Sequence, residues 1–377
     1  MTGKDYDTYL FPDEETRSFW VSVYVTLLSI YQTQLYFGFI LAVIGLPSNI
    51  LHMIILSRKS MRSSSTNILL LGISLFDFSI LLTILQPSVR DLMIKWFPRK
   101  IDSKCVPPQP LYELQFNDIL IFSSTLSRRV SVCLGVSLAV LRTVIIKNPL
   151  NNSASKLSTP GFGWLINISV VIFCIPFSIF IYLRTTILPY TTWTPPAKCG
   201  FPENYTDIRY YKEDNGWFSE RAVVETQQLL DTVVGQFLPC IILPIATILL
   251  VLEVRRHGKK KVGSNSNANN QKRERSSKLV LFMTITFLFA TIPLGAVSLL
   301  DSIVGDTPGY SKILLYMSSL LRLILSFNAI IHCLICFFMS SQYREATFGL
   351  FRIRISPRHS NNLVAVRAVG ESTGSHQ

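Results

Sequence analysis

Residues 18–57 read SFWVSVYVTLLSIYQTQLYFGFILAVIGLPSNILHMIILS, and this stretch contains no Asp, Glu, Lys or Arg. A helix crosses the hydrocarbon core of a membrane with about 20 apolar residues, so the stretch is longer than one span needs. We predict a membrane-spanning helix over residues 35–56, preceded outside the membrane by a hydrophobic lead-in. The first uncharged run therefore indicates a membrane protein.

Six further apolar runs of spanning length follow. Three of them carry charge well inside the run: Asp77 in the second predicted helix, Arg128 and Arg129 in the third, and Arg322 in the seventh. The sequence therefore predicts an all-α membrane protein, a bundle of seven transmembrane helices in the plasma membrane. The six further helices are predicted over residues 64–89 and 115–146, within the uncharged runs between Lys156 and Arg184, between Asp231 and Glu253 and between Lys278 and Asp301, and over residues 312–339.

The composition of the whole chain agrees with this interpretation. The 377 residues are 49% hydrophobic and 16% charged, whereas a soluble domain carries about 25% charged residues. Such a composition excludes intrinsic disorder, and seven cysteines are too few for a disulfide scaffold. The net charge of +13 lies mostly between the apolar runs and not on one patch of a water-soluble module. We therefore expect membrane lipids as partners and no nucleic acid.

The distribution of Lys and Arg predicts the orientation. With the N-terminus outside and the C-terminus cytoplasmic, the inner segments hold more Lys and Arg than the outer ones, over fewer residues. We predict an extracellular N-terminal segment over residues 1–34 and a seven-transmembrane domain over residues 35–340. Residues 341–377 form the predicted cytoplasmic tail, in which a short amphipathic helix lies on the membrane and is followed by disorder.

Two features of the predicted outer loops suit an oxidising, extracellular compartment. Cys105 and Cys199 fall in outer loops, whereas the other five cysteines fall within apolar spans. We predict one disulfide between them, with two free thiols as the alternative. Asn204-Tyr205-Thr206 is a glycosylation sequon in the loop between the fourth and fifth helices, which predicts a glycan on Asn204.

Polar residues inside the spans are functional candidates, because a membrane tolerates them poorly. We expect Asn49, Asp77, Ser131, Asn328 and His332 to meet in one polar cluster in the bundle core. This cluster serves either helix packing or a network that rearranges between two bundle states, and spacing alone does not separate these roles. No cofactor is expected; a sodium ion at Asp77 is the single candidate for a bound metal.

The third predicted helix carries a polar stripe along one face. Arg142 lies at its inner end, and Ser131 lies three turns earlier on the same face. Arg128 is about 21 Å from Arg142 along that face, and Ser124 extends the stripe, while Arg129 points elsewhere. This face therefore connects an outer cavity to the cytoplasmic end.

The arginines in the spans have two interpretations. Arg128 and Arg129 either pair with Asp77 or Asp118 or contact a ligand that carries a carboxylate or another acidic group. Arg322 lies where it can face the same cavity, and several guanidiniums at one pocket favour an anionic group. We therefore take as candidate ligand-binding residues Ser124, Arg128, Arg129 and Arg322.

One position in the sixth helix predicts flexibility. Pro293 removes a backbone hydrogen bond and is expected to kink its helix. Phe287 lies nearly two turns further inward, where it is expected to pack against the third helix as the kink shifts.

These residues resemble the rhodopsin-like G-protein-coupled receptors. Arg142 followed by Pro149-Leu150 resembles the inner end of helix 3 in that family. Strings at 127–131 (SRRVS), 134–139 (LGVSLA), 278–284 (KLVLFMT), 292–295 (IPLG) and 338–344 (FMSSQYR) are similar to the nematode serpentine receptor class W. The resemblance covers about residues 35–350. Single landmarks of the wider family match Asn49, Asp77, Trp164, Pro239 and Pro293.

The resemblance implies a function. Class W is similar to FMRFamide-type neuropeptide receptors, so it implies an extracellular peptide ligand and coupling to a heterotrimeric G protein. It also implies that Arg142, Pro149 and Leu150 lie at the coupling surface and that helix 6 moves outward around Pro293. By this reading, the peptide acts only through its higher affinity for the active state.

The chain departs from the wider family, and other functions compete. Leu141 replaces the acid before Arg142, Thr291 replaces the tryptophan before Pro293, and Cys333 and Cys336 occupy the proline and tyrosine places in helix 7. These changes put the basal activity in question. The alternatives are a chemoreceptor for a non-peptide small molecule and a secondary transporter, for which we find no internal repeat. An enzyme is not expected, because the spans offer no paired catalytic acids.

Overall fold

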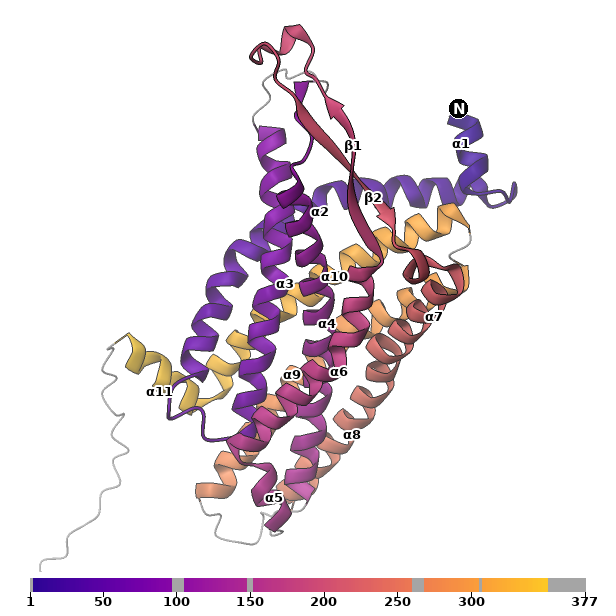
Figure 1. Ribbon diagram of the computed structural model, residues 1–377. Helices are drawn as coiled ribbons and strands as arrows, with labels where there is room; N and C mark the ends of the chain where they lie inside the picture. Colours follow the sequence, from indigo (N-terminus) through magenta and orange to yellow (C-terminus); the bar gives the residue numbers. More distant parts are fainter. Residues whose placement is uncertain (1–2, 97–104, 148–151, 260–267, 305–306, 352–377) are drawn as a thin grey trace, which may run out of the picture.

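The computed structural model describes residues 3–96, 105–147, 152–259, 268–304 and 307–351 (Figure 1). Within these residues, seven helices are long and apolar enough to cross a membrane, as the uncharged runs predicted. The spanning segments are Arg17–Leu56, Ser65–Leu85, Leu111–Lys147, Pro160–Phe180, Val233–Glu253, Lys278–Asp301 and Pro308–Met339.

The helices follow one another with short connections, apart from one excursion into strands. The elements are α1 (Gly3–Leu10), α2 (Arg17–Leu56), α3 (Ser65–Trp96), α4 (Leu111–Lys147), α5 (Asn152–Leu157), α6 (Pro160–Leu183), β1 (Thr185–Trp193), η2 (Ala197–Cys199), β2 (Asp207–Asp214), η3 (Gly216–Ser219), α7 (Arg221–Thr232), the π-helical turn η4 (Val233–Phe237), α8 (Leu238–Lys259), α9 (Ala268–Val304), α10 (Pro308–Met339) and α11 (Ser341–Leu350).

The core lies around α4, which packs against α3, α6, α8 and α9. Val130 and Leu134 of α4 are fully buried there with Leu69, Leu250 and Val280 from three other helices. Many large apolar side chains point outward instead, and Phe289 is 77% exposed. A soluble protein rarely exposes so much apolar surface, whereas a bundle in lipid does so on every outer face.

The first helix begins earlier than predicted. α2 is one continuous helix from Arg17, so the expected lead-in before residue 35 is helical, and the predicted start is wrong. Figure 1 shows this part running across the top of the molecule before α2 turns down into the bundle. The N-terminal part packs against α10, where the rings of Trp20 and Tyr310 lie 5.0 Å apart, and Phe11 lies 5.6 Å from Tyr310. These aromatic contacts explain why the helix extends beyond the length of a span.

The all-α prediction misses a β-hairpin between α6 and α7. β1 pairs antiparallel with β2, and the register shifts by one residue between Pro189 and Thr191. Proline has no N–H to donate to a strand ladder, so an irregularity at this position is expected. β1 is rich in Thr and ends in Trp193, and both strands contain Ile and Tyr; these residues favour extended structure.

Two further helix ends differ from the prediction. α3 continues to Trp96 instead of ending near residue 89. The fifth span, Val233–Glu253, lies in the predicted uncharged run, but the helix that contains it begins earlier, at Arg221, because α7 continues through η4 into α8. Pro239 lies two residues after the end of η4, and because its nitrogen donates no hydrogen bond, a local π turn is compatible with the helix at this point.

The amphipathic helix predicted after the seventh span is present as α11. Ser340 caps it by accepting a hydrogen bond from the backbone nitrogen of Tyr343 at 3.2 Å. The predicted disorder after residue 356 lies outside the described residues. The predicted domain boundaries at residues 34/35 and 340/341 stay predictions.

Candidate functional site

The bundle has two distinct ends (Figure 1). We call the end that carries β1 and β2 the hairpin end, and the end that carries α5 and α11 the tail end. The predicted disulfide is present at the hairpin end, between Cys105 and Cys199, whose Cα atoms lie 5.3 Å apart. It joins η2, in the connection between the strands, to the segment just before α4. The hairpin connection is thereby tied to the start of the third span.

A second contact holds the hairpin to α4. Lys212 of β2 forms an ion pair with Asp118 of α4. Asp118 was one of the two acids expected to pair with Arg128 or Arg129, and its carboxylate is engaged by this lysine. Asn204 lies in the connection between the strands, exposed and with a φ of 70°, a conformation that asparagine tolerates well.

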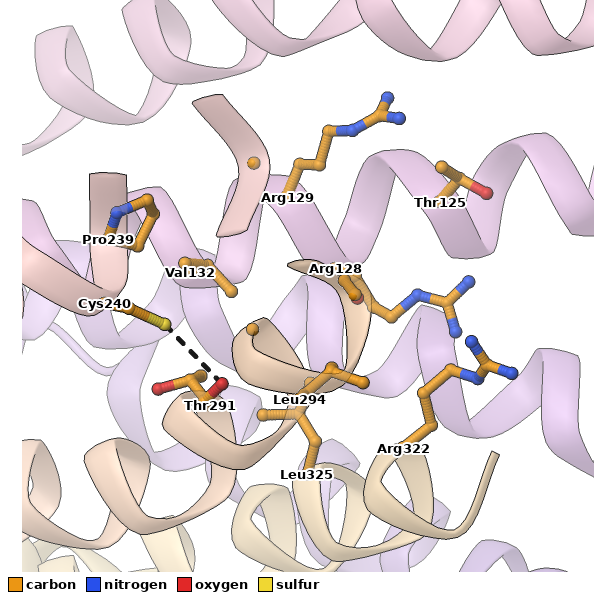
Figure 2. A pocket seen from close by; sticks show the side chains of 13 residues that line it. Thr125, Arg128, Arg129, Val132, Pro239, Cys240, Thr291, Leu294, Arg322 and Leu325 are labelled. Atoms are coloured by element: carbon orange, nitrogen blue, oxygen red, sulfur yellow. Dashed lines mark hydrogen bonds between the residues drawn. The ribbon is translucent and has the colours of Figure 1, made fainter. Parts of the chain in front are cut away.

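Beneath the hairpin end, a cavity of about 200 Å³ lies between α4, η4, α8, α9 and α10. Arg128 and Arg322 line it from α4 and α10, and Figure 2 shows their guanidinium groups directed toward one another. Arg129 also lines the cavity, but Figure 2 shows it pointing away from this pair. Its Nη1 donates to the Ser178 hydroxyl of α6 at 2.6 Å.

A second cavity, of about 320 Å³, adjoins the first between α2, α3, α4 and α10. Arg128 and Arg322 line both cavities, so they form part of the wall between them. Ser124 lines the second cavity, together with Gln34, whose Nε2 donates to the Ser319 hydroxyl at 2.7 Å. The structure thus brings together Ser124, Arg128 and Arg322, while Arg129 is directed to α6.

Four of the five expected core residues meet below these cavities. Asp77 accepts a hydrogen bond from the Ser131 hydroxyl at 2.8 Å, and its other oxygen lies 3.6 Å from Nδ1 of His332. Nε2 of His332 lies 3.0 Å from the amide nitrogen of Asn328. Asn49 is buried, but its amide nitrogen donates to the Gly45 carbonyl of its own helix at 3.0 Å. This hydrogen bond lies within α2 and does not join Asn49 to the other four residues.

The groups beside Asp77 bear on the predicted sodium ion. Hard cations bind oxygen ligands, and the carboxylate has one hydroxyl and one imidazole beside it. Among the described residues, no group of three or more His, Cys, Asp or Glu side chains could hold a metal ion. A sodium ion at Asp77 stays a prediction, because sodium also takes hydroxyl and water oxygens as ligands.

Phe287 connects the first cavity to this core. A Cβ placed on Gly135 of α4 would lie 3.5 Å from the Phe287 ring, so the phenylalanine packs against the third span at a glycine. The ring is stacked with His332 at 6.5 Å between centroids. Thr291 lines the cavity and donates to the Phe287 carbonyl at 2.8 Å. Pro293 follows on the same helix and lies on its exposed side.

At the tail end, Arg142 is buried near the end of α4. Leu141 beside it packs into the apolar core. At this position the resemblance to rhodopsin-like receptors implied an acid. Pro149 and Leu150, the other expected coupling residues, lie outside the described residues.

A polar contact at the tail end was missed in the sequence. Nδ1 of His52 in α2 lies 2.7 Å from the hydroxyl of Tyr343 in α11, and both side chains are fully buried. The sulfur of Cys333 lies 3.5 Å from the same hydroxyl. Arg58 donates to the Ala346 carbonyl at 3.1 Å, and Gln342 donates to the carbonyl of Ser60. We call these contacts the tail clamp; a histidine inside an apolar run was its only sequence signal.

This architecture is that of a seven-transmembrane receptor. Seven apolar spans surround a buried polar core, a disulfide holds the hairpin above a cavity, and a short helix lies at the other end. The family model of the serpentine type 7TM GPCR chemoreceptor Srw matches residues 36–354, and the chain belongs to this family. The resemblance to receptor class W is thereby confirmed. No curated protein matches the chain. The protein is a multi-pass protein of the plasma membrane, from a class of receptors and not of enzymes.

Proposed function

We propose that the protein is a G-protein-coupled receptor for an extracellular peptide, with the hairpin end outside and the tail end in the cytoplasm. The observation that carries this proposal is the pair of cavities beneath the hairpin, into which Arg128 and Arg322 project. Their volumes of about 200 and 320 Å³ together suit a small ligand or the end of a peptide.

A chain of contacts supports transmission from the cavity to the core. Thr291 lines the cavity, bonds to the backbone of Phe287 and lies two residues before Pro293. Phe287 packs on His332, which lies beside Asp77. A ligand that changes the position of Thr291 therefore also biases the packing of α9 on α4. Such a shift signals only if the ligand binds one bundle state more tightly than the other.

At the cytoplasmic end, we propose that Arg142 and the segments beside α4 and α9 contact a heterotrimeric G protein. Leu141 offers no carboxylate to restrain Arg142 in the resting state. We expect ligand binding to raise G-protein activation above the level measured without ligand.

The test is G-protein dissociation in cells that express the receptor at matched surface levels. Energy transfer between Gα and Gβγ is measured for each Gα class, without ligand and with pooled synthetic neuropeptides. We expect Arg142→Ala to remove basal and stimulated signals, and Lys147→Ala, an exposed basic residue one and a half turns further along α4, to leave them unchanged. Equal signals from Arg142→Ala and wild type would contradict the proposed coupling.

Orientation is tested in the same cells with an epitope tag on the N-terminus. We expect the antibody to stain intact cells, and staining only after permeabilisation would reverse the proposed topology.

A receptor for a non-peptide small molecule is the second candidate. The family description as chemoreceptors and the modest volume of each cavity favour it. A response to small acids but to no peptide pool would select this candidate.

A further inference from the structure

We infer that Arg128 and Arg322 bind a free carboxylate of the ligand and that Gln34 accepts a hydrogen bond from an N–H beside that carboxylate. This inference rests on the proposed function only in taking the two cavities as the ligand site. It assigns the ligand a chemical class, which is a carboxylic acid and, most completely, a peptide with an unmodified C-terminus.

The charge at the cavity wall is the first argument. Arg128 and Arg322 come from different helices, line both cavities and direct their guanidinium groups toward each other (Figure 2). A carboxylate between the two guanidinium groups can accept charge-assisted hydrogen bonds from both of them.

The shape of the donor groups selects the anion. A guanidinium presents N–H groups in a planar fork that matches the two oxygens of a carboxylate. Hydroxyl groups of Ser124 and Ser319 lie in the same cavity lining and supply further donors. A neutral carboxamide offers only one oxygen to these donors and carries no charge.

Gln34 supplies an independent observation. Its nitrogen is engaged with Ser319, but its Oε1 is buried and accepts no hydrogen bond from any described group. A buried acceptor without a donor is unfavourable, so this oxygen favours a ligand that brings an N–H. The last residue of a peptide carries both groups, a backbone N–H and the terminal carboxylate, within one residue.

The inference separates this receptor from the ligands that its resemblance to FMRFamide-type receptors suggested. Such a peptide ends in Arg-Phe-amide, so it lacks the carboxylate and brings a cation to two arginines. We expect this end to be excluded from the two cavities and peptides with a free C-terminus to be accepted.

The experiment measures thermal unfolding of the purified full-length receptor in lipid nanodiscs. The probes are N-acetyl-Leu-Phe as the free acid, the same dipeptide as the C-terminal amide, 3-phenylpropionate and 3-phenylpropanamide. We expect the dipeptide acid to raise the melting temperature most, 3-phenylpropionate to raise it less, and both amides to leave it unchanged. The two acids distinguish a peptide terminus from a simple carboxylic acid.

Variants locate the effect in the cavity wall. Arg322→Gln is expected to weaken binding of the dipeptide acid at least about tenfold, because a charge-assisted hydrogen bond is lost. Arg322→Lys keeps the positive charge but not the planar guanidinium, so its affinity for the dipeptide acid should lie between those of wild type and Arg322→Gln. This variant controls for a folding defect of the glutamine variant. Gln34→Met should weaken the dipeptide acid and not 3-phenylpropionate. Lys312→Gln removes one charge from the same helix outside the cavity lining, and we expect no change.

Equal stabilisation by acid and amide, or no stabilisation by either acid at millimolar concentration, overturns the inference. Loss of binding in Lys312→Gln equal to that in Arg322→Gln also overturns it, because bulk charge then explains the effect. Adding the probes to the G-protein assay separates the two proposals. Acid binding without any G-protein response refutes the proposed function alone, whereas signalling by the dipeptide amide that is independent of Arg322 refutes this inference alone.

Discussion

The hairpin end and the tail end of the bundle differ in what the polar side chains of each end contact. At the tail end, the hydroxyl of Tyr343 has His52 and Cys333 as partners, and α11 is held against α2 by them. At the hairpin end, Oε1 of Gln34 is buried without a described donor, and two guanidiniums face a pair of cavities. Hydrogen bonds between side chains of different elements hold those elements together at the tail end, whereas the buried Oε1 of Gln34 can accept a hydrogen bond from a ligand.

The largest expected effect tests the tail clamp. Tyr343→Ala removes one of the largest fully buried side chains, so we expect a loss of about 3–5 kcal/mol in stability, as for other buried aromatic residues. Thermal unfolding of the purified receptor measures it. Tyr343→Phe removes only the hydroxyl and leaves His52 without its partner, so it should cost about 1–3 kcal/mol. If Tyr343→Phe is as stable as wild type, the hydrogen bond contributes little to the clamp.

The disulfide at the hairpin end gives the next effect. We expect Cys105→Ser to destabilise the receptor by about 2–4 kcal/mol, because the bridge closes a loop between residues 94 apart in sequence. Accessibility of the hairpin to limited proteolysis should rise in parallel, while the tail clamp is unaffected. Cys240→Ser is the matched control, since that thiol is unbridged and lies beside the cavity. Equal sensitivity of both variants to proteolysis would mean that the bridge does not order the hairpin.

The tail clamp also predicts a dependence on pH. Burial raises the pKa of the Tyr343 phenol above its usual value of about 10, so the folded receptor keeps this proton where the unfolded chain loses it. The contribution is fully present below pH 10 and falls at higher pH, by up to about 1.4 kcal/mol per pH unit. Melting temperatures between pH 8 and 11 should therefore fall more steeply for wild type than for Tyr343→Phe. Parallel curves would show that the phenol does not titrate differently in the folded state.

The smallest expected effect concerns Asn204. Its exposure in the hairpin connection supports a glycan, so Asn204→Gln should lower the apparent mass of the protein expressed in eukaryotic cells without changing the melting temperature. Removal of N-glycans with a glycosidase should abolish the mass difference. An identical mass for wild type and variant before this treatment would argue against the sequon and against the outward placement of the hairpin.

Much of the site could be predicted as a set of residues but not as an arrangement. The stripe Ser124, Arg128 and Ser131 followed from the helical repeat, and the structure places the first two at a cavity and the third on Asp77. Arg322 was expected at the same cavity as Arg128 and lies there. Asn49 was expected in the polar cluster, but its amide bonds within α2, because a buried side chain on a helix can reach a carbonyl of its own previous turn.

The number of spans and the disulfide could both be predicted from the amino-acid sequence. The thickness of the hydrocarbon core sets the length of each uncharged run, and only two cysteines lie outside these runs. Only the tertiary structure decided the hairpin, the early start of α2 and the contact of His52 with Tyr343 across 291 positions of sequence. Only it separated Arg128, which faces Arg322, from Arg129, which faces Ser178. The physical reason is that neighbouring residues on a helix point in different directions, and the partner that each one meets depends on how distant helices pack.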